Sequence, residues 1–519
     1  MPETLDEKIV WEVIDSFFKD NPNYLVKHQL ESYDEFFEKD FNNIIREKNP
    51  IRIMKNQDPD TKEYNLKCDL YIGGKNADHI YYGKPVIYNE SEQEPIQYMY
   101  PNTARLRNMT YGFSIHVNVD IEFEINTGEE IIKESRTLEN IFLGRFPIML
   151  QSKLCILNGL TPEARFNMGE CRNDYGGYFI IDGSEKVIVS QEKFANNMLY
   201  IRDKVNDIYS HSAEIRTVSE DASKPERTLS IRIVAPTTSL TNEQIVVNVP
   251  NVRKPVPLFI LMRALGVISD KRIIEYCLLD LEQNESMVEL FRPSIHDALA
   301  IFDQHSALKY IATFTKGKTI AHVMDILYNY FMPNIGTIEL DNKAYMLGYI
   351  VNKLLRVYTK LEKPTDRDSF RYKRIEVAGI LLYSLFKEFY TKQQKNIKDV
   401  IDQKYYYNEG TYQKDFISLI ITNSYDIFKD RILETGVRKG FKGHWGGETR
   451  TYREGIVQTL ERLSYNKTIS LLRKVNLQLD SSAKIVGPRL LNSTQWGIID
   501  PLDTPDGGNI GTHKHFALA

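Results

Sequence analysis

Residues 111–124 read YGFSIHVNVDIEFE and constrain the fold more than any other stretch of the chain. Polar and apolar side chains alternate through the run, and a β-strand places successive side chains on opposite faces of a sheet. Such a half-buried strand needs neighbours for its backbone hydrogen bonds, so we expect an antiparallel sheet over residues 51–139. His116 fits the alternation, and we interpret it as a strand residue rather than a metal ligand.

Helical patterns lie on both sides of this region. Residues 4–19 repeat apolar side chains near the helical period, and Thr4 and Glu7 have the spacing of a capping box. A second helix is expected over about residues 24–46. We interpret the apolar stripes of both helices as packing faces. Residues 381–436 are again helical and amphipathic, which is consistent with packing back on the first region.

Residues 205–380 form a different region. Strands are expected first, at Ser230–Ile233 and Gln244–Val249, and helices follow, beginning with a buried apolar stretch at Leu258–Leu265. A chain of 519 residues is too long for a single hydrophobic core. These patterns together predict a multidomain α+β protein with mixed helices and antiparallel sheets.

A compact turn-rich block lies between the two regions. Two glycines precede residues 178–181 and an Asp-Gly pair follows them, which predicts a strand bounded by tight turns. The block also carries four carboxylates that could form an acidic metal cluster. We favour the alternative that they cap backbone donors in turns. The four are Glu170, Asp174, Asp182 and Glu185.

The four cysteines are widely scattered, without a C-x-x-C pair or histidines at ligand spacing. This pattern supports neither a disulfide framework nor a zinc site, and it fits a reducing compartment. The amino terminus is acidic and lacks the apolar segment of a signal peptide. Since no apolar run approaches membrane-spanning length, we expect a soluble intracellular protein without membrane partners.

Positive charge is concentrated near the carboxyl end. From Arg438 to Arg489 there are eleven Lys/Arg against four Asp/Glu, a balance of +7, whereas the whole chain is −4 and the remainder is therefore −11. A basic segment in an acidic protein is typical of a site for a polyanion.

Residues 436–447 are expected to form a mobile loop, because the segment is rich in glycine. Arg438, Lys439 and Lys442 would grip phosphates, and His444 and Trp445 could stack on bases or wedge between them. The alternative is a flexible surface loop with incidental charge.

The segment 500–507 reads DPLDTPDG and contains three carboxylates, Asp500, Asp503 and Asp506. They could bind a metal for phosphoryl transfer, but the spacing has no calcium-loop pattern and the prolines stiffen the backbone. We favour a structural role for these carboxylates over metal binding. Trp496 is expected to anchor the adjoining turns in the core.

Nine blocks along the chain, in order, carry a resemblance to a known family. They are WEVIDSFFKDNPNYLVKHQLESYDEFF (11–37), YPNTARLRNMTY (100–111), RFPIML (145–150), GECRNDYGGYFIIDGSEKVIVSQE (169–192), HSAEIRT (211–217), FILMRALGV (259–267), DRDSFRYKRIEVAG (366–379), GIVQTLERLSYNKTISLLRKVN (455–476) and PRLLNSTQWGIIDPLDTPDGGNIG (488–511). The chain resembles the amino-terminal half of the second-largest (β-type) subunit of multisubunit DNA-directed RNA polymerases, nearest to the eukaryotic polymerase II kind.

The resemblance implies a domain layout that composition does not show. Residues 1–204 and 381–436 would form the two parts of the protrusion, residues 205–380 the inserted lobe, and residues 437–519 the fork.

It also implies roles for residues of the fork. The loop at 436–447 would be the first fork loop, beside the upstream end of the RNA–DNA hybrid. The second fork loop would be Asp480–Gly487, where Lys484 is the only cation. The expected nucleic-acid contacts are Arg438, Lys439, Lys442, Gln458, Arg462, Arg473, Lys474, Lys484 and Arg489.

Two acidic positions depart from the family pattern. The family commonly carries E-T-P-E-G, whereas here the two carboxylates are Asp503 and Asp506. Their side chains are one carbon shorter, so contacts that glutamates make elsewhere would be lost. We expect both residues to support the active site without binding metal.

By resemblance, the chain helps hold template DNA and the RNA–DNA hybrid against the largest polymerase subunit. Other polymerase subunits, and the remaining half of a split β-type subunit, are further expected partners. Mg²⁺ would serve the assembled polymerase, held mainly by aspartates of the largest subunit, so this chain alone is expected to be inactive. A nuclear location is expected, or host cytoplasm and virion if the source is a large DNA virus.

Two alternatives come from other classes. The first is a free-standing nucleic-acid-binding protein that has lost its polymerase partners. The second is an independent metal-dependent phosphotransferase built on the carboxylates of residues 500–506.

Overall fold

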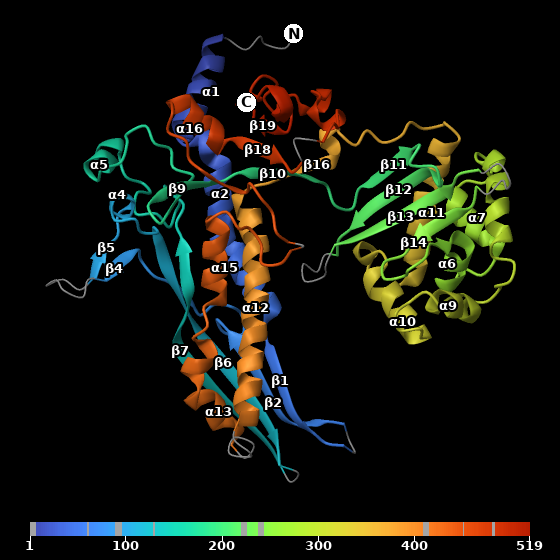
Figure 1. Cartoon of the computed structure of the whole chain (residues 1–519), viewed down its shortest axis with the longest axis horizontal. Helices are drawn as coiled ribbons and strands as arrows, with labels where there is room; N and C mark the ends of the chain where they lie inside the picture. The colour runs from blue at the N-terminus through green and yellow to red at the C-terminus, as the bar shows by residue number, and fades with distance from the viewer. Residues whose placement is uncertain are drawn as a thin grey trace. The chain divides into compact units, whose positions relative to one another are not determined.

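The computed structural model describes residues 7–59, 62–88, 96–127, 130–219, 226–236, 243–407, 415–449, 451–479 and 483–518 (Figure 1). The chain divides into two compact units. Unit 1 contains residues 1–193, 375–491 and 495–519, and unit 2 contains residues 194–374 and 492–494. Both units combine helices with antiparallel strands, which confirms the predicted α+β class. The assignment of segments to a protrusion, a lobe and a fork stays a prediction.

An antiparallel sheet forms one layer of unit 1. Its long central strand, β6 (Gly112–Asn126), pairs with β2 (Tyr64–Ile72), β3 (Ile80–Tyr82) and β7 (Ile131–Pro147), and β2 pairs in turn with β1 (Ile51–Gln57). Buried and partly buried side chains alternate along β6, with Cys68 of β2 opposite Phe123. The alternation in the sequence therefore predicted both the strand and its buried face, and His116 lies in it as expected.

Helices from two distant parts of the chain pack together in unit 1. Near the start of the chain these are α2 (Lys27–Glu35) and α3 (Phe41–Lys48). The third is α12 (Ala378–Tyr407), which comes more than 300 residues later. Phe36, Phe41 and Phe386 meet in an aromatic cluster at ring distances of 4.6–6.2 Å. At the first turn of α12, a Cβ added to Gly379 would lie only 1.9 Å from the carbonyl oxygen of Ser32. The two backbones approach this closely only because residue 379 is glycine.

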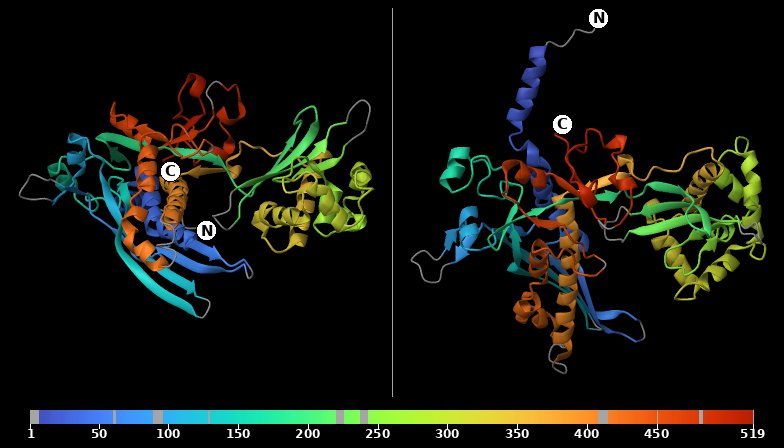
Figure 2. Two further views of the ribbon diagram at one scale, coloured as in Figure 1. Left: turned by 60° about the horizontal axis from the view of Figure 1, so that its bottom comes forward. Right: turned by 45° about the horizontal axis from the view of Figure 1, so that its top comes forward.

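The first helix, α1 (Glu7–Asp20), departs from the prediction. None of its residues is buried, and Figure 2 shows it extending from the rest of unit 1. Trp11 is 60% exposed and Val13 is 63% exposed, while Phe17 and Phe18 contact the ring of Tyr24. Interpreting its apolar stripe as an intramolecular packing face was therefore wrong. The helical period was present, but the described part of the chain leaves Ile9, Val13 and Phe17 of the stripe 44–63% exposed.

The turn-rich block forms the predicted hairpin. Strand β8 (Phe179–Ile181) is fully buried and pairs with β9 (Ser184–Ile188). Asp182 and Gly183 connect them with φ values of 47° and 80°, the left-handed conformation that an Asp-Gly turn supplies. Strand β17 (Val457–Thr459) extends the hairpin on the other side of β9, so a segment near residue 458 lies against residues 186–188.

The other elements of unit 1 are shorter. Strands β10 (Ser190–Phe194), β18 (Lys474–Leu477) and β19 (His513–His515) are neighbours in one sheet. Lys514 of β19 and Glu192 of β10 form a buried ion pair at 2.7 Å. The remaining elements are β4 (Val86–Tyr88), β5 (Ile96–Tyr98), α4 (Pro101–Leu106), α5 (Pro162–Asn167), α13 (Phe416–Thr422), α14 (Ser424–Phe428), α15 (Ile432–Phe441) and α16 (Tyr465–Leu472).

Unit 2 packs an antiparallel sheet against helices. The strand order is β11 (Leu199–Asp203), β12 (Tyr209–Thr217), β13 (Arg227–Val234), β14 (Ile245–Asn248) and β15 (Val256–Pro257). Every residue of α6 (Leu258–Ala264) is buried, which confirms the predicted apolar core segment. The other helices are α7 (Asp270–Leu278), α8 (Arg292–His296), α9 (Gln304–Ala312), α10 (Ile320–Asp325) and α11 (Leu340–Tyr358).

The cysteine and membrane predictions can be compared with the described residues. All four cysteines are free thiols, and three of them are buried. Among the helices that the structure describes, none combines the length and apolarity needed to cross a bilayer.

We expect acid to weaken unit 1 through His28. Its Nε2 lies 3.0 Å from the carbonyl oxygen of Leu472, and burial lowers the pKa of the imidazole to about 4 from its usual 6.5. The folded state holds the ring neutral, so the unfolded chain binds the proton first as the pH falls. The stabilisation is complete above about pH 6.5 and is lost toward pH 4, with about 2 kcal/mol gone at pH 5.

Urea unfolding at pH 7 and pH 5 measures this effect. The chain is compared with a His28→Gln variant, which keeps a polar side chain but cannot titrate. Between pH 7 and pH 5 the free energy of unfolding is expected to fall by about 2 kcal/mol less in the variant than in the unmodified chain. An equal loss in both proteins would rule out His28 as the titrating group.

Candidate nucleic-acid interface

The first predicted nucleic-acid segment, residues 436–447, is helical in its first half. Residues 436–441 belong to α15, so the expected loop at 436–447 is wrong for its first half. Leu433, Val437 and Phe441 recur at helical spacing and are buried. Gly436 and Gly440 face α12, where a Cβ on Gly436 would lie 2.2 Å from the ring of Phe389. These glycines permit close helix packing instead of marking a loop.

Arg438 and Lys442 reach the same carboxylate near the end of α15. Their side-chain nitrogens lie 3.1 and 2.6 Å from Asp182, in the hairpin turn, and Thr110 donates to the same carboxylate at 3.0 Å. The hydrogen bond from Lys442 is the main cause that lowers the pKa of Asp182. Both cations remain 44–59% exposed, so they retain a surface for phosphate while Asp182 orients them.

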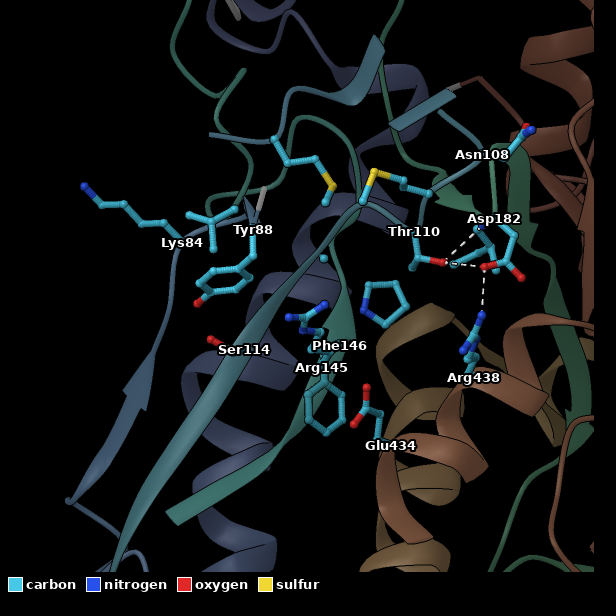
Figure 3. Close-up of a pocket in the computed structure, with 16 residues that line it drawn as sticks. Lys84, Tyr88, Asn108, Thr110, Ser114, Arg145, Phe146, Asp182, Glu434 and Arg438 are labelled. Atoms are coloured by element: carbon cyan, nitrogen blue, oxygen red, sulfur yellow. Dashed lines mark hydrogen bonds and ion pairs between the residues drawn. The ribbon is translucent and has the colours of Figure 1, made fainter. Parts of the chain in front are cut away.

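Arg438 also lines a pocket of about 290 Å³ (Figure 3). Figure 3 shows Asp182, Thr110 and Arg438 joined at one end, and Lys84 and Tyr88 at the other. Arg145 lies with its guanidinium 6.0 Å from the ring of Tyr88. Lys439 points elsewhere and is exposed, beside Thr435 and Asp430 in a shallower hollow. The three predicted cations therefore do not form one continuous group.

Arg462 lies in an ion-pair network. Its guanidinium contacts Glu185 at 2.8 Å and Asp174 at 3.1 Å, and it donates to the hydroxyl of Tyr178 at 3.0 Å. Arg105 contacts the same Glu185 at 2.9 Å and the buried Glu170 at 2.7 Å. We call Arg105, Glu170, Asp174, Tyr178, Glu185 and Arg462 the arginine–carboxylate network.

This network contains three of the four carboxylates of the turn-rich block, and the fourth, Asp182, pairs with Arg438 and Lys442. All four carboxylates thus contact arginine or lysine side chains. Among the described residues there is no group of three or more His, Cys, Asp or Glu that could hold a metal ion. Asp174 also caps the backbone N–H of Gly176 at 2.8 Å, the kind of contact favoured for it from the sequence.

Arg473 and Lys474 follow the end of α16 and diverge. Arg473 is 7% exposed, and its guanidinium donates to the carbonyl oxygens of Leu25, Phe516 and Ala517 at 2.6–3.1 Å. It ties the chain near residue 25 to the chain near residue 516. Lys474 begins strand β18, and burial lowers the pKa of its ammonium group. These contacts favour a structural role for Arg473.

The remaining predicted contacts are Gln458, Lys484 and Arg489. Gln458, on β17, donates from its amide to the carbonyl of Gly455 at 3.2 Å. Arg489 donates to the carbonyl oxygens of Ile485 and Ile510 at 3.1 and 3.2 Å, and so joins two turns. Lys484 is exposed. Of the predicted second fork loop at 480–487, residues 480–482 lie outside the described residues.

The acidic turn organises its own backbone. Asp500 accepts from the backbone N–H of Leu502 at 2.8 Å, and Asp503 lies 3.3 Å from Nδ1 of His515 and accepts from Ser470 at 3.2 Å. Asp506 is exposed. Trp496 is 78% exposed, so its expected burial is wrong; the buried positions nearby are Gln495 and Ile499.

Two important side chains of the network were missed from the sequence. Arg105 and Tyr178 lie within the quoted blocks 100–111 and 169–192, but nothing local in either block indicates their partners. Their significance depends on contacts across 65–284 positions of the chain.

Comparison with known proteins identifies the family of the chain. A family model described as RNA polymerase beta subunit matches residues 24–427, which is more than half of the chain. The chain belongs to the RNA polymerase beta subunit family. A second model, RNA polymerase Rpb2, domain 3, matches residues 458–519, and so covers most of the candidate interface. The resemblance read from the nine blocks is confirmed.

Relatives of this beta-subunit chain occur in eukaryotes and archaea. It is 34% identical to DNA-directed RNA polymerase II subunit RPB2 of Encephalitozoon cuniculi, over 98% of this chain and 43% of that protein. It is 32% identical to the subunit of the same name in Schizosaccharomyces pombe, over 99% and 43%. With DNA-directed RNA polymerase subunit Rpo2 of Saccharolobus solfataricus, identity is 32% over 99% and 42%. The chain thus spans about two fifths of the length of these relatives.

Proposed function

We propose that this chain works as part of the second-largest subunit of a DNA-directed RNA polymerase and helps form the cleft for template DNA and the RNA–DNA hybrid. The observation that carries the proposal is the match to relatives named as polymerase subunits along 98–99% of the chain. The fixed, partly exposed cations of residues 438–489 support it, because phosphate contacts need positive charge at defined positions.

The predicted contacts are sorted by what each side chain already holds. Arg438, Lys439, Lys442 and Lys484 are exposed and suit direct phosphate contact. Three other side chains would bind nucleic acid while they keep their intramolecular contacts. Gln458 and Lys474 are partly exposed, and Arg462 forms an ion pair with Glu185. Arg473 and Arg489 act by fixing backbone, and Asp503 and Asp506 support the turn beside them.

Mg²⁺ would supply charge neutralisation at the reacting phosphates of the assembled polymerase. The described residues of this chain do not fit a metal site, since Asp500 is bonded to its own turn and Asp503 to His515 and Ser470. We therefore assign the metal to a partner, the largest subunit. Nothing in these contacts favours the metal-dependent phosphotransferase alternative.

Co-assembly tests the proposed function. The chain is co-expressed with a homologous largest subunit and with the carboxyl-terminal part of the beta-type subunit. We expect all three to co-purify, and template-directed nucleotide incorporation to require every one of them. A chain that binds nucleic acid but associates with neither partner would support the free-standing alternative instead. Incorporation by the chain alone would overturn the assignment of the metal to a partner.

A further inference from the structure

Within the charged run at residues 366–374, all of which the structure describes, the arginines form no ion pair with Asp366 or Asp368. From the sequence, its mixed signs indicate ion pairing on a solvated surface. In the structure, Arg367 lies with its guanidinium carbon 4.3 Å from the ring centroid of Phe194, and Lys373 lies with its ammonium 4.0 Å from the same centroid. Arg216, from strand β12, is 5.9 Å from it. All of these residues belong to unit 2.

Four arginines gather here without forming ion pairs. Arg216, Arg367, Arg371 and Arg374 are called the arginine cluster, and none of the four forms an ion pair with any residue that the structure describes. Two of the nearby carboxylates are engaged elsewhere. Asp366 accepts from the backbone N–H of Asp368 and from Asn492, and Glu214 pairs with Arg202.

The positive charges of the arginine cluster are close enough to repel one another. Arg216 and Arg367 share one ring, at 5.9 and 4.3 Å, so their guanidinium carbons are at most 10.2 Å apart. This is about one Debye length at 0.1 M salt, so the repulsion is only partly screened. Asp366 and Asp368 lie in the same fully described run, yet neither forms an ion pair with these arginines. An anion from outside would offset the repulsion.

Aromatic packing holds the cluster in place. The rings of Phe194 and Tyr200 lie 5.9 Å apart, those of Tyr200 and Tyr372 lie 5.4 Å apart, and Arg371 lies 5.8 Å from the ring of Tyr372. Arg374 donates to the carbonyls of Arg371 and Lys373 at 3.2 and 2.7 Å. Positions fixed in this way lose little side-chain entropy when a ligand binds.

The arginine content of the cluster favours a phosphate ligand over a carboxylate ligand. Guanidinium groups present a planar pair of donors that matches two phosphate oxygens, and arginine tolerates partial desolvation better than lysine.

The segment that follows Arg489 also contacts the run at residues 366–374. Asn492 donates to Asp366 at 2.9 Å, and the hydroxyl of Thr494 accepts from the N–H of Phe370 at 2.8 Å.

We propose that the arginine cluster of unit 2 is a second nucleic-acid-binding surface, which contacts the phosphate backbone of a strand and is separate from the cations of residues 438–489. It rests on the proposed function, because it assumes that the chain meets nucleic acid. Its ligand is the backbone and not the bases, since guanidinium groups rather than free aromatic faces are presented.

Salt-dependent binding tests the proposal. Affinity of the full chain for a labelled single-stranded oligonucleotide is measured by fluorescence anisotropy between 50 and 200 mM salt. The cluster variant is Arg367→Gln, Arg371→Gln, Arg374→Gln. The matched control removes three exposed cations of the same unit through Lys309→Gln, Lys316→Gln and Lys318→Gln. A third variant, Arg438→Gln, Lys439→Gln, Lys442→Gln, reports on the other surface.

In the cluster variant, the slope of the logarithm of the binding constant against the logarithm of salt concentration is expected to be shallower by about 2. This is roughly 0.7 per phosphate contact on a single strand. Over this salt range the unmodified chain then loses about 20-fold more affinity than the variant. The control variant should keep the original slope. Circular dichroism checks folding, and the single variant Arg371→Gln, with a slope change of about 0.7, serves if the triple variant fails to fold.

Three results would overturn the proposal. They are an unchanged slope in the cluster variant, an equal change in the control, and displacement of the oligonucleotide by polyglutamate at equal charge concentration. A loss confined to the residue 438–442 variant would reject the second surface and leave the proposed polymerase role intact. Failure of co-assembly, with the cluster slope change present, would reject the polymerase role alone.

Discussion

Replacing Gly379 by alanine is expected to lower the free energy of unfolding by about 3 kcal/mol. In an ordinary helix this change stabilises by about 1 kcal/mol, because alanine is the better helix former. Here the new methyl group would lie 1.9 Å from the carbonyl oxygen of Ser32. Since that atom belongs to the backbone of α2, the two helices would have to separate, and the aromatic cluster around Phe386 would loosen.

Urea unfolding of the Gly379→Ala variant measures the loss. Ser384→Ala, an exposed position on the same helix, is the matched control and should change stability by no more than about 0.5 kcal/mol. Stabilisation by Gly379→Ala would show that α2 and α12 are not in close backbone contact.

Replacing Arg105 by methionine is expected to cost about 3–5 kcal/mol, the usual result of removing one partner from a buried ion pair. Glu170 is 6% exposed and contacts Arg105 at 2.7 Å. Without the guanidinium, Glu170 would be a buried carboxylate facing no cation of the network, and Glu185 would keep only Arg462 within it. The loss would therefore reflect a charge left buried without its partner, and not only the loss of one contact.

Thermal or urea unfolding at pH 7 measures this loss. Arg107→Met removes the same charge two positions away at an exposed site, and it should change stability by no more than about 0.5 kcal/mol. An equal effect of the two substitutions would mean that net charge, rather than the network, stabilises this region.

The elements that could be predicted from the sequence depend on local patterns. The period of two along residues 111–124 is enough to predict β6, and the Asp-Gly pair at 182–183 is enough to predict the turn of the hairpin. Glycine spacing was ambiguous in residues 436–440. The same two glycines favour a loop when considered alone and a close helix contact when α12 is present.

The candidate site was less predictable because its contacts are long-range. Basic composition indicated which segment carries cations, but it cannot show that Arg473 is buried by the residues near 25 and 516. Likewise, the run at 366–374 contains two acidic and four basic residues, and only the fold places Phe194 among its cations. Exposure of Trp496 and of the apolar face of α1 also depends on what the rest of the chain covers.

The division of the chain has a consequence for biosynthesis. The core of unit 1 joins residues before 194 to α12, which begins at Ala378, so its early strands and helices cannot complete their packing until α12 leaves the ribosome. At about 5–20 residues per second, the intervening segment of about 180 residues takes roughly 10–40 s to synthesise. Throughout that interval the parts of α2, α3 and β1 that α12 covers remain open to solvent, and chaperone demand should peak before residue 378 is made.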